Sequence, residues 1–191
     1  MLKDLHVSLF IVPVIVLSLV IGTYVFLLKK TEDQAFFKRL IARIAILAFV
    51  LNLTWELAQG PLYEGYVYDF QHISFCTLAS LADVLMVLLL YQGFASILKE
   101  PLWMGSPTVG RVLALMSVGA LGAILAEIRH TWEGNWAYAE SMPLLPFVEV
   151  GLSPVLQFTL LPVLVYWLSF QWIKKTPKQG LNRSMGDKNS V

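Results

Sequence analysis

The chain has 191 residues, enough for one domain, and 57% of them are hydrophobic while only 14% are charged. A soluble domain carries about 25% charged residues, so this composition excludes a water-soluble body, and a net charge of +1 gives no basis for binding nucleic acid. Cys76 is the only cysteine, which excludes an intrachain disulfide and a thiolate metal cluster. No phosphate-binding glycine loop, G-x-S-x-G elbow or H-E-x-x-H motif occurs, so no cofactor is predicted.

Five apolar stretches are each long enough to cross a bilayer, which takes about 20 residues in a helix. In chain order they cover about residues 7–28, 37–59, 72–91, 111–128 and 151–173. The first is too long for the apolar part of a signal peptide, and no A-x-A-like cleavage site follows it. Gly60-Pro61 ends the second stretch, Gly93 closes the third, and Pro154 and Pro162 predict a kink in the fifth. We therefore expect an all-α bundle of five transmembrane helices.

Lysine and arginine residues fall almost entirely on one side of this bundle, which predicts its orientation. If the N-terminus lies outside, twelve of the fourteen lie on the cytoplasmic side: Lys29, Lys30, Lys38, Arg39, Arg43, Lys99, Arg111, Lys174, Lys175, Lys178, Arg183 and Lys188. Only Lys3 and Arg129 lie on the other side. We therefore predict one multi-pass domain over residues 1–175 in the inner (plasma) membrane of the cell, followed by a polar cytoplasmic tail over residues 176–191.

The predicted outer side is acidic and rich in tryptophan. Its loops hold five acids: Glu64, Asp69, Glu133, Glu140 and Glu149, the last of them in the loop or at the start of the fifth span. Tryptophans at the same level, Trp55, Trp132 and Trp136, match the aromatic belt of membrane proteins without any further function. A belt does not explain acids inside the spans.

Polar residues enter the spans from this outer side. Asn52, Glu56 and Gln59 are spaced i, i+4, i+7 and share one face of the second span. Asp83 lies about 16 Å beyond His72 along the third span, near the bilayer centre. Glu127 and His130 are an i, i+3 pair at the outer end of the fourth span, and Gln157 lies in the fifth.

An ionisable residue inside a span costs about 2.5–3.5 kcal/mol, so each needs a partner, a cavity or a pathway. The structural interpretation gives each residue a role without chemistry. Asn52 and Gln157 would form hydrogen bonds between helices, and Glu56 and Glu127 would reach water at the membrane interface. Asp83 would be a neutral acid that supports the fold. The functional interpretation is a buried acid kept neutral, which is a natural proton donor.

The first pattern of residues resembles a family of small bacterial multi-pass membrane proteins. It consists of N-x-x-W-E-x-x-Q-x-P-L-Y from Asn52 to Tyr63, G-x-W-x-Y-x-E-x-M-P from Gly134 to Pro143, and G-L-S-P-x-L-Q from Gly151 to Gln157. This resemblance covers the second to fifth spans and implies a multi-pass bundle without implying an activity.

A second pattern is shorter. Asn52-x-x-Trp55-Glu56 followed by Asp83 in the next helix resembles the small membrane terpene cyclases of fungal meroterpenoid and indole-diterpene pathways. That resemblance implies that Glu56 and Asp83 protonate an epoxide or alkene to start cyclisation. The chain departs from those cyclases in length, in the number of spans and in its last two helices. Sterol isomerases of the emopamil-binding type are similar only in architecture and in having acids inside the bundle.

The first hypothesis is therefore a membrane-embedded acid–base enzyme, of isomerase or cyclase type, acting on an apolar lipid such as an isoprenoid. Glu56 or Asp83 would be the proton donor, and Glu127 or His130 the base or its orienting partner. Predicted substrate contacts are Asn52, Trp55, Gln59, Tyr63, His72, Trp132, Trp136, Tyr138, Glu140 and Gln157, whose aromatic rings could stabilise a carbocation.

Two other hypotheses remain open. A transporter, channel subunit or assembly protein would use the same acids as a proton relay or docking surface. A metal enzyme would bind iron, manganese or zinc through Glu127, His130, Glu56 and His72. The sequence leaves the oligomeric state and the substrate's identity open.

Overall fold

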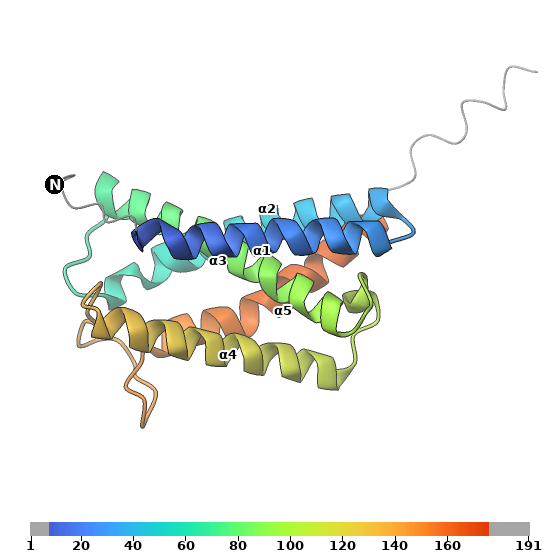
Figure 1. The fold of residues 1–191 in the computed structure, drawn as a ribbon. Helices are drawn as coiled ribbons and strands as arrows, with labels where there is room; N and C mark the ends of the chain where they lie inside the picture. Colours follow the sequence, from blue (N-terminus) through green and yellow to red (C-terminus); the bar gives the residue numbers. More distant parts are fainter. Residues whose placement is uncertain (1–7, 176–191) are drawn as a thin grey trace, which may run out of the picture.

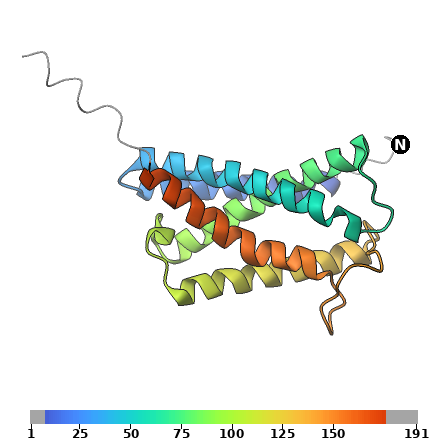
Figure 2. The ribbon, with the colours of Figure 1, turned by 180° about the vertical axis from the view of Figure 1, so that it is seen from behind.

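The computed structural model describes the backbone of residues 8–175 and the side chains of residues 14–172, and it is all-α (Figures 1 and 2). Its five helices are α1 (Ser8–Lys30), α2 (Gln34–Gln59), α3 (Phe70–Ile97), α4 (Val109–Trp132) and α5 (Leu152–Lys175). Two short 3-10 helices, η1 (Gly60–Leu62) and η2 (Trp103–Gly105), lie in the connections. The predicted tail over residues 176–191 lies outside the described residues.

Within the described residues, four helices are long and apolar enough to cross a membrane: Gln34–Leu62, Phe70–Ile97, Val109–Trp132 and Leu152–Trp172. Their exposed side chains include Leu78, Leu121 and Leu125, which hydrocarbon would cover at little cost. This supports a small helical multi-pass membrane protein.

The helix ends follow from local sequence. Asp33, Asp69 and Thr108 begin α2, α3 and α4 as caps, each accepting a hydrogen bond from the backbone N–H three residues later. The prediction that Gly60-Pro61 ends the second span is confirmed, because α2 ends at Gln59 and the chain continues into η1. The prediction that the third span closes at Gly93 is wrong.

The helix α3 continues through Gly93 to Ile97. One glycine costs a helix only about 1 kcal/mol relative to alanine. Burial of Tyr91, Gln92 and Ala95 on this last part of α3 opposes that small cost. Packing therefore decides the end of α3, and the glycine does not.

The helices pack in an uneven arrangement. Helix α2 packs against both α3 and α5, and α1 packs mainly on α3. Helix α4 joins the bundle through α5 and hardly touches α3 (Figure 1). Near the α3–α4 connection, Trp103 of η2 packs against both Tyr91 and Tyr166, with ring centroids 5.9 and 6.2 Å away.

The contact between α4 and α5 depends on Gly119. A Cβ at this buried position would collide with the backbone carbonyl oxygen of Phe158. We expect Gly119→Ala to destabilise the protein by about 1–3 kcal/mol, because two backbones must separate to admit one methyl group. Gly122→Ala on the same helix is the matched control, because nothing lies within 4 Å of its added Cβ.

Unfolding of the two variants in detergent, followed by circular dichroism, measures the difference. The control should be as stable as the unsubstituted chain or more stable, by up to about 1 kcal/mol, since alanine favours a helix. Equal stability of the two variants would contradict the close approach of α4 and α5.

Candidate functional site

The two connections at one end of the bundle pair with each other. Tyr63, just after η1, forms an isolated antiparallel bridge with Tyr138, in the connection between α4 and α5. On either side of it, the N–H of Glu64 donates to the carbonyl of Ala137 (2.9 Å) and that of Ala139 to Leu62 (3.0 Å). We call residues 62–64 and 137–139 the cap. It ties the end of α2 to the segment that joins α4 and α5.

A hydrogen-bonded polar network lies where α2, α3 and α5 meet. Its centre is Gln157 of α5, which is buried. The Gln157 Nε2 lies 2.9 Å from Asn52 Oδ1, 3.1 Å from Glu56 Oε1 and 3.1 Å from Asp83 Oδ2. One amide of α5 therefore joins a carboxyl group of α2 to a carboxyl group of α3. Asn52, Glu56 and Asp83, which the sequence places inside the spans, therefore lie around one amide group.

The same network extends along α2 toward the cap. Gln59 Nε2 donates to Glu56 Oε1 at 2.9 Å and to the side-chain oxygen of Gln157 at 3.0 Å. Ser153 Oγ donates to Gln59 Oε1 at 2.8 Å and accepts from Trp55 Nε1 at 3.2 Å. Ser153 was not among the predicted site residues. The signal that could have found it is its position one helical turn before Gln157, on the same face of α5.

The network holds two acids, Glu56 and Asp83, and no positively charged donor reaches them among the described residues. Every donor that reaches Glu56 or Asp83 is a neutral amide. The ion pairs among the described residues lie elsewhere and join His72 to Asp69, Arg111 to Glu100 and Arg129 to Glu133. Two carboxyl groups in a membrane-embedded helical bundle thus share one amide, whose two protons face three acceptor oxygens.

A third acid, Glu127, belongs to a second cluster, which includes two tyrosines of the cap. Glu127, in the last turns of α4, is buried. Its Oε2 accepts hydrogen bonds from Trp136 Nε1 at 3.2 Å and from the hydroxyl of Tyr138. The ring of Tyr63 packs edge-on against Trp136 at 6.1 Å and tilted against Tyr138 at 5.7 Å. We call Glu127, Trp136, Tyr138 and Tyr63 the aromatic cluster.

Tyr63 connects the aromatic cluster with the polar network. Burial raises the pKa of its phenol well above the usual range, and the nearby charges of Glu127, Glu56 and Asp83 raise it further. The Tyr63 hydroxyl is therefore protonated near neutral pH and within electrostatic reach of all three acids. Burial and the bond to Glu127 likewise raise the pKa of Tyr138 above its usual range.

Some predicted site residues lie at the edge of these clusters or away from them. His130 stacks on Trp136 with ring centroids 4.3 Å apart, and its Nδ1 lies 2.9 Å from Asn135 Nδ2. It makes no hydrogen bond to Glu127. Trp132 is 87% exposed and Glu140 is also exposed, so neither contributes to the buried site.

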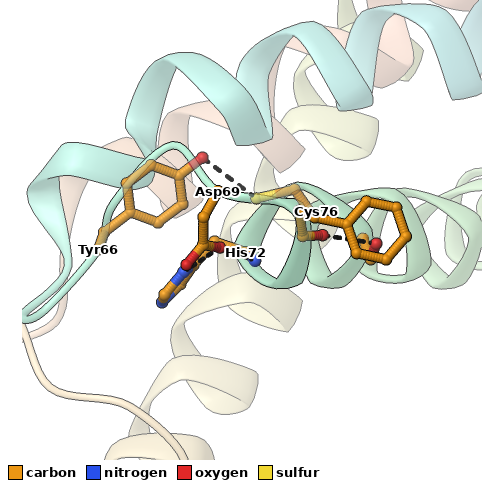
Figure 3. Close-up of polar contacts among 6 residues, drawn as sticks. Tyr66, Asp69, His72 and Cys76 are labelled. Carbon is orange, nitrogen blue, oxygen red and sulfur yellow. Dashed lines mark hydrogen bonds and ion pairs between the residues drawn. The ribbon is translucent and has the colours of Figure 1, made fainter.

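His72 has local partners at the start of α3 (Figure 3). Its Nδ1 lies 2.8 Å from Asp69 Oδ1, and its ring packs edge-on against Tyr66, whose hydroxyl lies 3.9 Å from Cys76 Sγ. Hydrogen bonds from the backbone N–H and then the ring of His72 hold the pKa of Asp69 below its usual range. Burial raises the pKa of Tyr66 to about 12.

The ligand set predicted for a metal enzyme is not assembled. Among the side chains that the structure describes, no three histidine, cysteine or acidic residues come close enough together to hold a metal ion. His72 pairs with Asp69, while Glu127 bonds to Trp136 and Tyr138. The proposed convergence of Glu127, His130, Glu56 and His72 on one ion is therefore wrong.

Comparison with protein-family models, with curated proteins and with solved structures found no match to this chain. The two family resemblances of the sequence therefore stay predictions. What is established is a small helical protein with four apolar helices of membrane-spanning length in the part of the chain that the structure describes.

Proposed function

We propose that the protein is a membrane-embedded acid–base enzyme, of isomerase or cyclase type, whose substrate is an apolar lipid of isoprenoid character. One observation carries the proposal. Glu56 and Asp83, from adjacent helices, share the amide of Gln157, and no ion pair among the residues that the structure describes reaches either acid.

The chemistry follows from the cost of charge in hydrocarbon. Two ionised carboxylates here would each cost about 2.5–3.5 kcal/mol, so the pair is expected to hold a proton. A neutral carboxylic acid in a site of low polarity can donate that proton to a carbon–carbon double bond of the lipid. The acid becomes a carboxylate and the substrate becomes a cation.

The aromatic cluster supplies the second half of the reaction. The ring faces of Tyr63 and Trp136 would stabilise the cation as it forms. A carboxylate, either Glu127 or the donor itself, then removes a proton from a neighbouring carbon and leaves a rearranged double bond. The net change is an isomerisation or ring closure, with as many protons released as were taken up, and it needs no cofactor.

Two features of the bundle would admit a lipid from the side. Helices α3 and α4 hardly touch, and the side chain of Asp83 remains partly exposed although it bonds to Gln157. Further along α4 and α5, an apolar groove of about 330 Å³ is lined by Met116, Leu160, Val163, Leu164 and Trp167. Such a groove is suited to the hydrocarbon tail of a lipid whose reactive end lies at the acids.

The lipid composition of the membrane tests this function. Cells that lack the protein should accumulate one apolar lipid, and expression of the unsubstituted chain should convert it to an isomer of equal mass, either rearranged or cyclised. Chromatography of total lipid extracts separates the two isomers, and mass spectrometry measures the amount of each. Identical lipid profiles with and without the protein would contradict the proposal.

A proton relay is the second candidate. Glu56 interacts electrostatically with Glu127 and with Asp83, so the three acids form a series from the middle of the bundle to the cap. A transporter could pass protons along such a series. It would leave every lipid unchanged, so the lipid profile separates the two candidates.

We also propose five spans, with α1 as the first, the N-terminus outside and the C-terminus in the cytoplasm, in the plasma membrane. The observation that supports this is the charge bias of twelve to two among the lysines and arginines. A green fluorescent protein fused after Val191 should fluoresce, and alkaline phosphatase fused there should be inactive. Active phosphatase at this position would overturn the topology.

A further inference from the structure

A short hairpin projects from the bundle just before α5. Leu144 and Gly151 form an isolated antiparallel bridge at its base. The N–H of Leu145 donates to the carbonyl of Val150 at 2.8 Å, and that of Leu152 to Pro143 at 2.7 Å. Leu145 and Val150 also pack into a small apolar core with residues of α4 and α5. The base of the hairpin is therefore fixed to the bundle.

The tip of this hairpin is apolar and held outward. Phe147 is 101% exposed, and Leu144 and Val148 are 49% and 40% exposed. Phe147 has a φ of 72° and Glu149 a φ of 53°, backbone conformations that bulky residues rarely adopt. Strain of this kind persists only where the surrounding structure enforces it, and it often marks a functional segment. The fixed base thus presents an aromatic ring that is fully exposed among the residues that the structure describes.

The direction of the hairpin decides what it can meet. Figures 1 and 2 show it leaving the capped end of the bundle and projecting sideways, across the helix direction, on the side where α4 lies. The ends of membrane-spanning helices lie at the boundary between hydrocarbon and water. A sideways projection from such an end stays at that boundary, and it points away from the bundle into the surrounding bilayer.

We propose that Leu144, Pro146, Phe147 and Val148 insert into the lipid interface at the capped end of the bundle and anchor it there. The sequence Leu-Leu-Pro-Phe-Val carries no charge, and an aromatic ring with neighbouring apolar side chains suits the headgroup boundary. Glu149 follows the tip and can remain in water beside the headgroups. This proposal is independent of the chemistry proposed for Glu56 and Asp83.

A spin label at Phe147 tests the anchor in the full chain, reconstituted in phosphatidylcholine vesicles. The only native thiol, Cys76, is buried, so the unsubstituted chain provides the background signal. Phe147→Cys is compared with Leu121→Cys, exposed on the apolar part of α4, and with Glu140→Cys, exposed near the cap. Collision with oxygen reports lipid, and collision with a water-soluble nickel complex reports water.

The label at position 147 should collide with oxygen several-fold more than with the nickel complex, as the label at position 121 does. The label at position 140 should show the reverse. If the label at position 147 collides with the nickel complex as often as the label at position 140 does, the tip lies in water and the proposal is overturned. Shielding from both reagents would also overturn it, since the tip would then contact protein, either a second copy or another chain.

Discussion

Asp83→Asn and Glu56→Gln are each expected to lower product formation by about 10²–10⁴, the usual contribution of a positioned acid or base. Each amide keeps the size of the side chain and an oxygen that accepts from Gln157 Nε2, and it removes only the acidic proton. Folding should survive, because a neutral amide costs no more in a span than the acid that it replaces. Mass spectrometry of the lipids, normalised to the amount of membrane protein, measures the loss.

Glu140→Gln is the matched control, because it makes the same change at an exposed acid near the cap. It should retain full activity. A purely structural role for the two acids predicts a different pattern, in which the amide variants work normally and alanine variants lose stability. Full activity of both Asp83→Asn and Glu56→Gln would exclude them as proton donors and favour a transport or assembly role.

Gln157→Leu is expected to cause the largest loss of stability. The substitution removes the amide that bonds to Asn52, Glu56, Gln59 and Asp83. A buried polar group left without its partner costs about 1–3 kcal/mol, and Asn52 and Gln59 are both buried. It should also lower activity, since the two carboxyl groups lose the group that holds them together.

Gln71→Leu provides the control for this substitution, because Gln71 is exposed at the start of α3. Thermal unfolding of the two purified variants in detergent measures the difference. The control should unfold near the temperature of the unsubstituted chain, and Gln157→Leu well below it. Equal unfolding temperatures would mean that the network around Gln157 contributes little to the fold.

Much of the fold could be predicted because hydropathy marks membrane helices directly. The polar face of α2 could also be predicted, since Asn52, Glu56 and Gln59 follow the helical period. The partners across helices could not, because Gln157 lies 101 residues from Glu56 and 74 from Asp83 in the sequence. No local pattern encodes such a pairing.

The aromatic residues of the connection between α4 and α5 show the same limit. Trp136 and Tyr138 could be selected as candidate contacts from composition alone. Their hydrogen bonds to Glu127 depend on the fold of the connection and on its pairing with Tyr63. The partner of His72 was not predicted either, because its ring bonds to its neighbour Asp69 and not to the polar network.

Transfer of a proton from solvent to a carbon atom of a lipid tests the central claim most directly. Membranes that contain the protein are incubated in heavy water with the accumulated lipid, and the extracted product is examined by mass spectrometry. Because a carboxyl proton exchanges with solvent, the product should carry one deuterium on carbon with the unsubstituted chain, and Asp83→Asn or Glu56→Gln should form about 10²–10⁴ times less of it. If no lipid gains deuterium on carbon in a way that depends on the protein, the acid–base mechanism is contradicted.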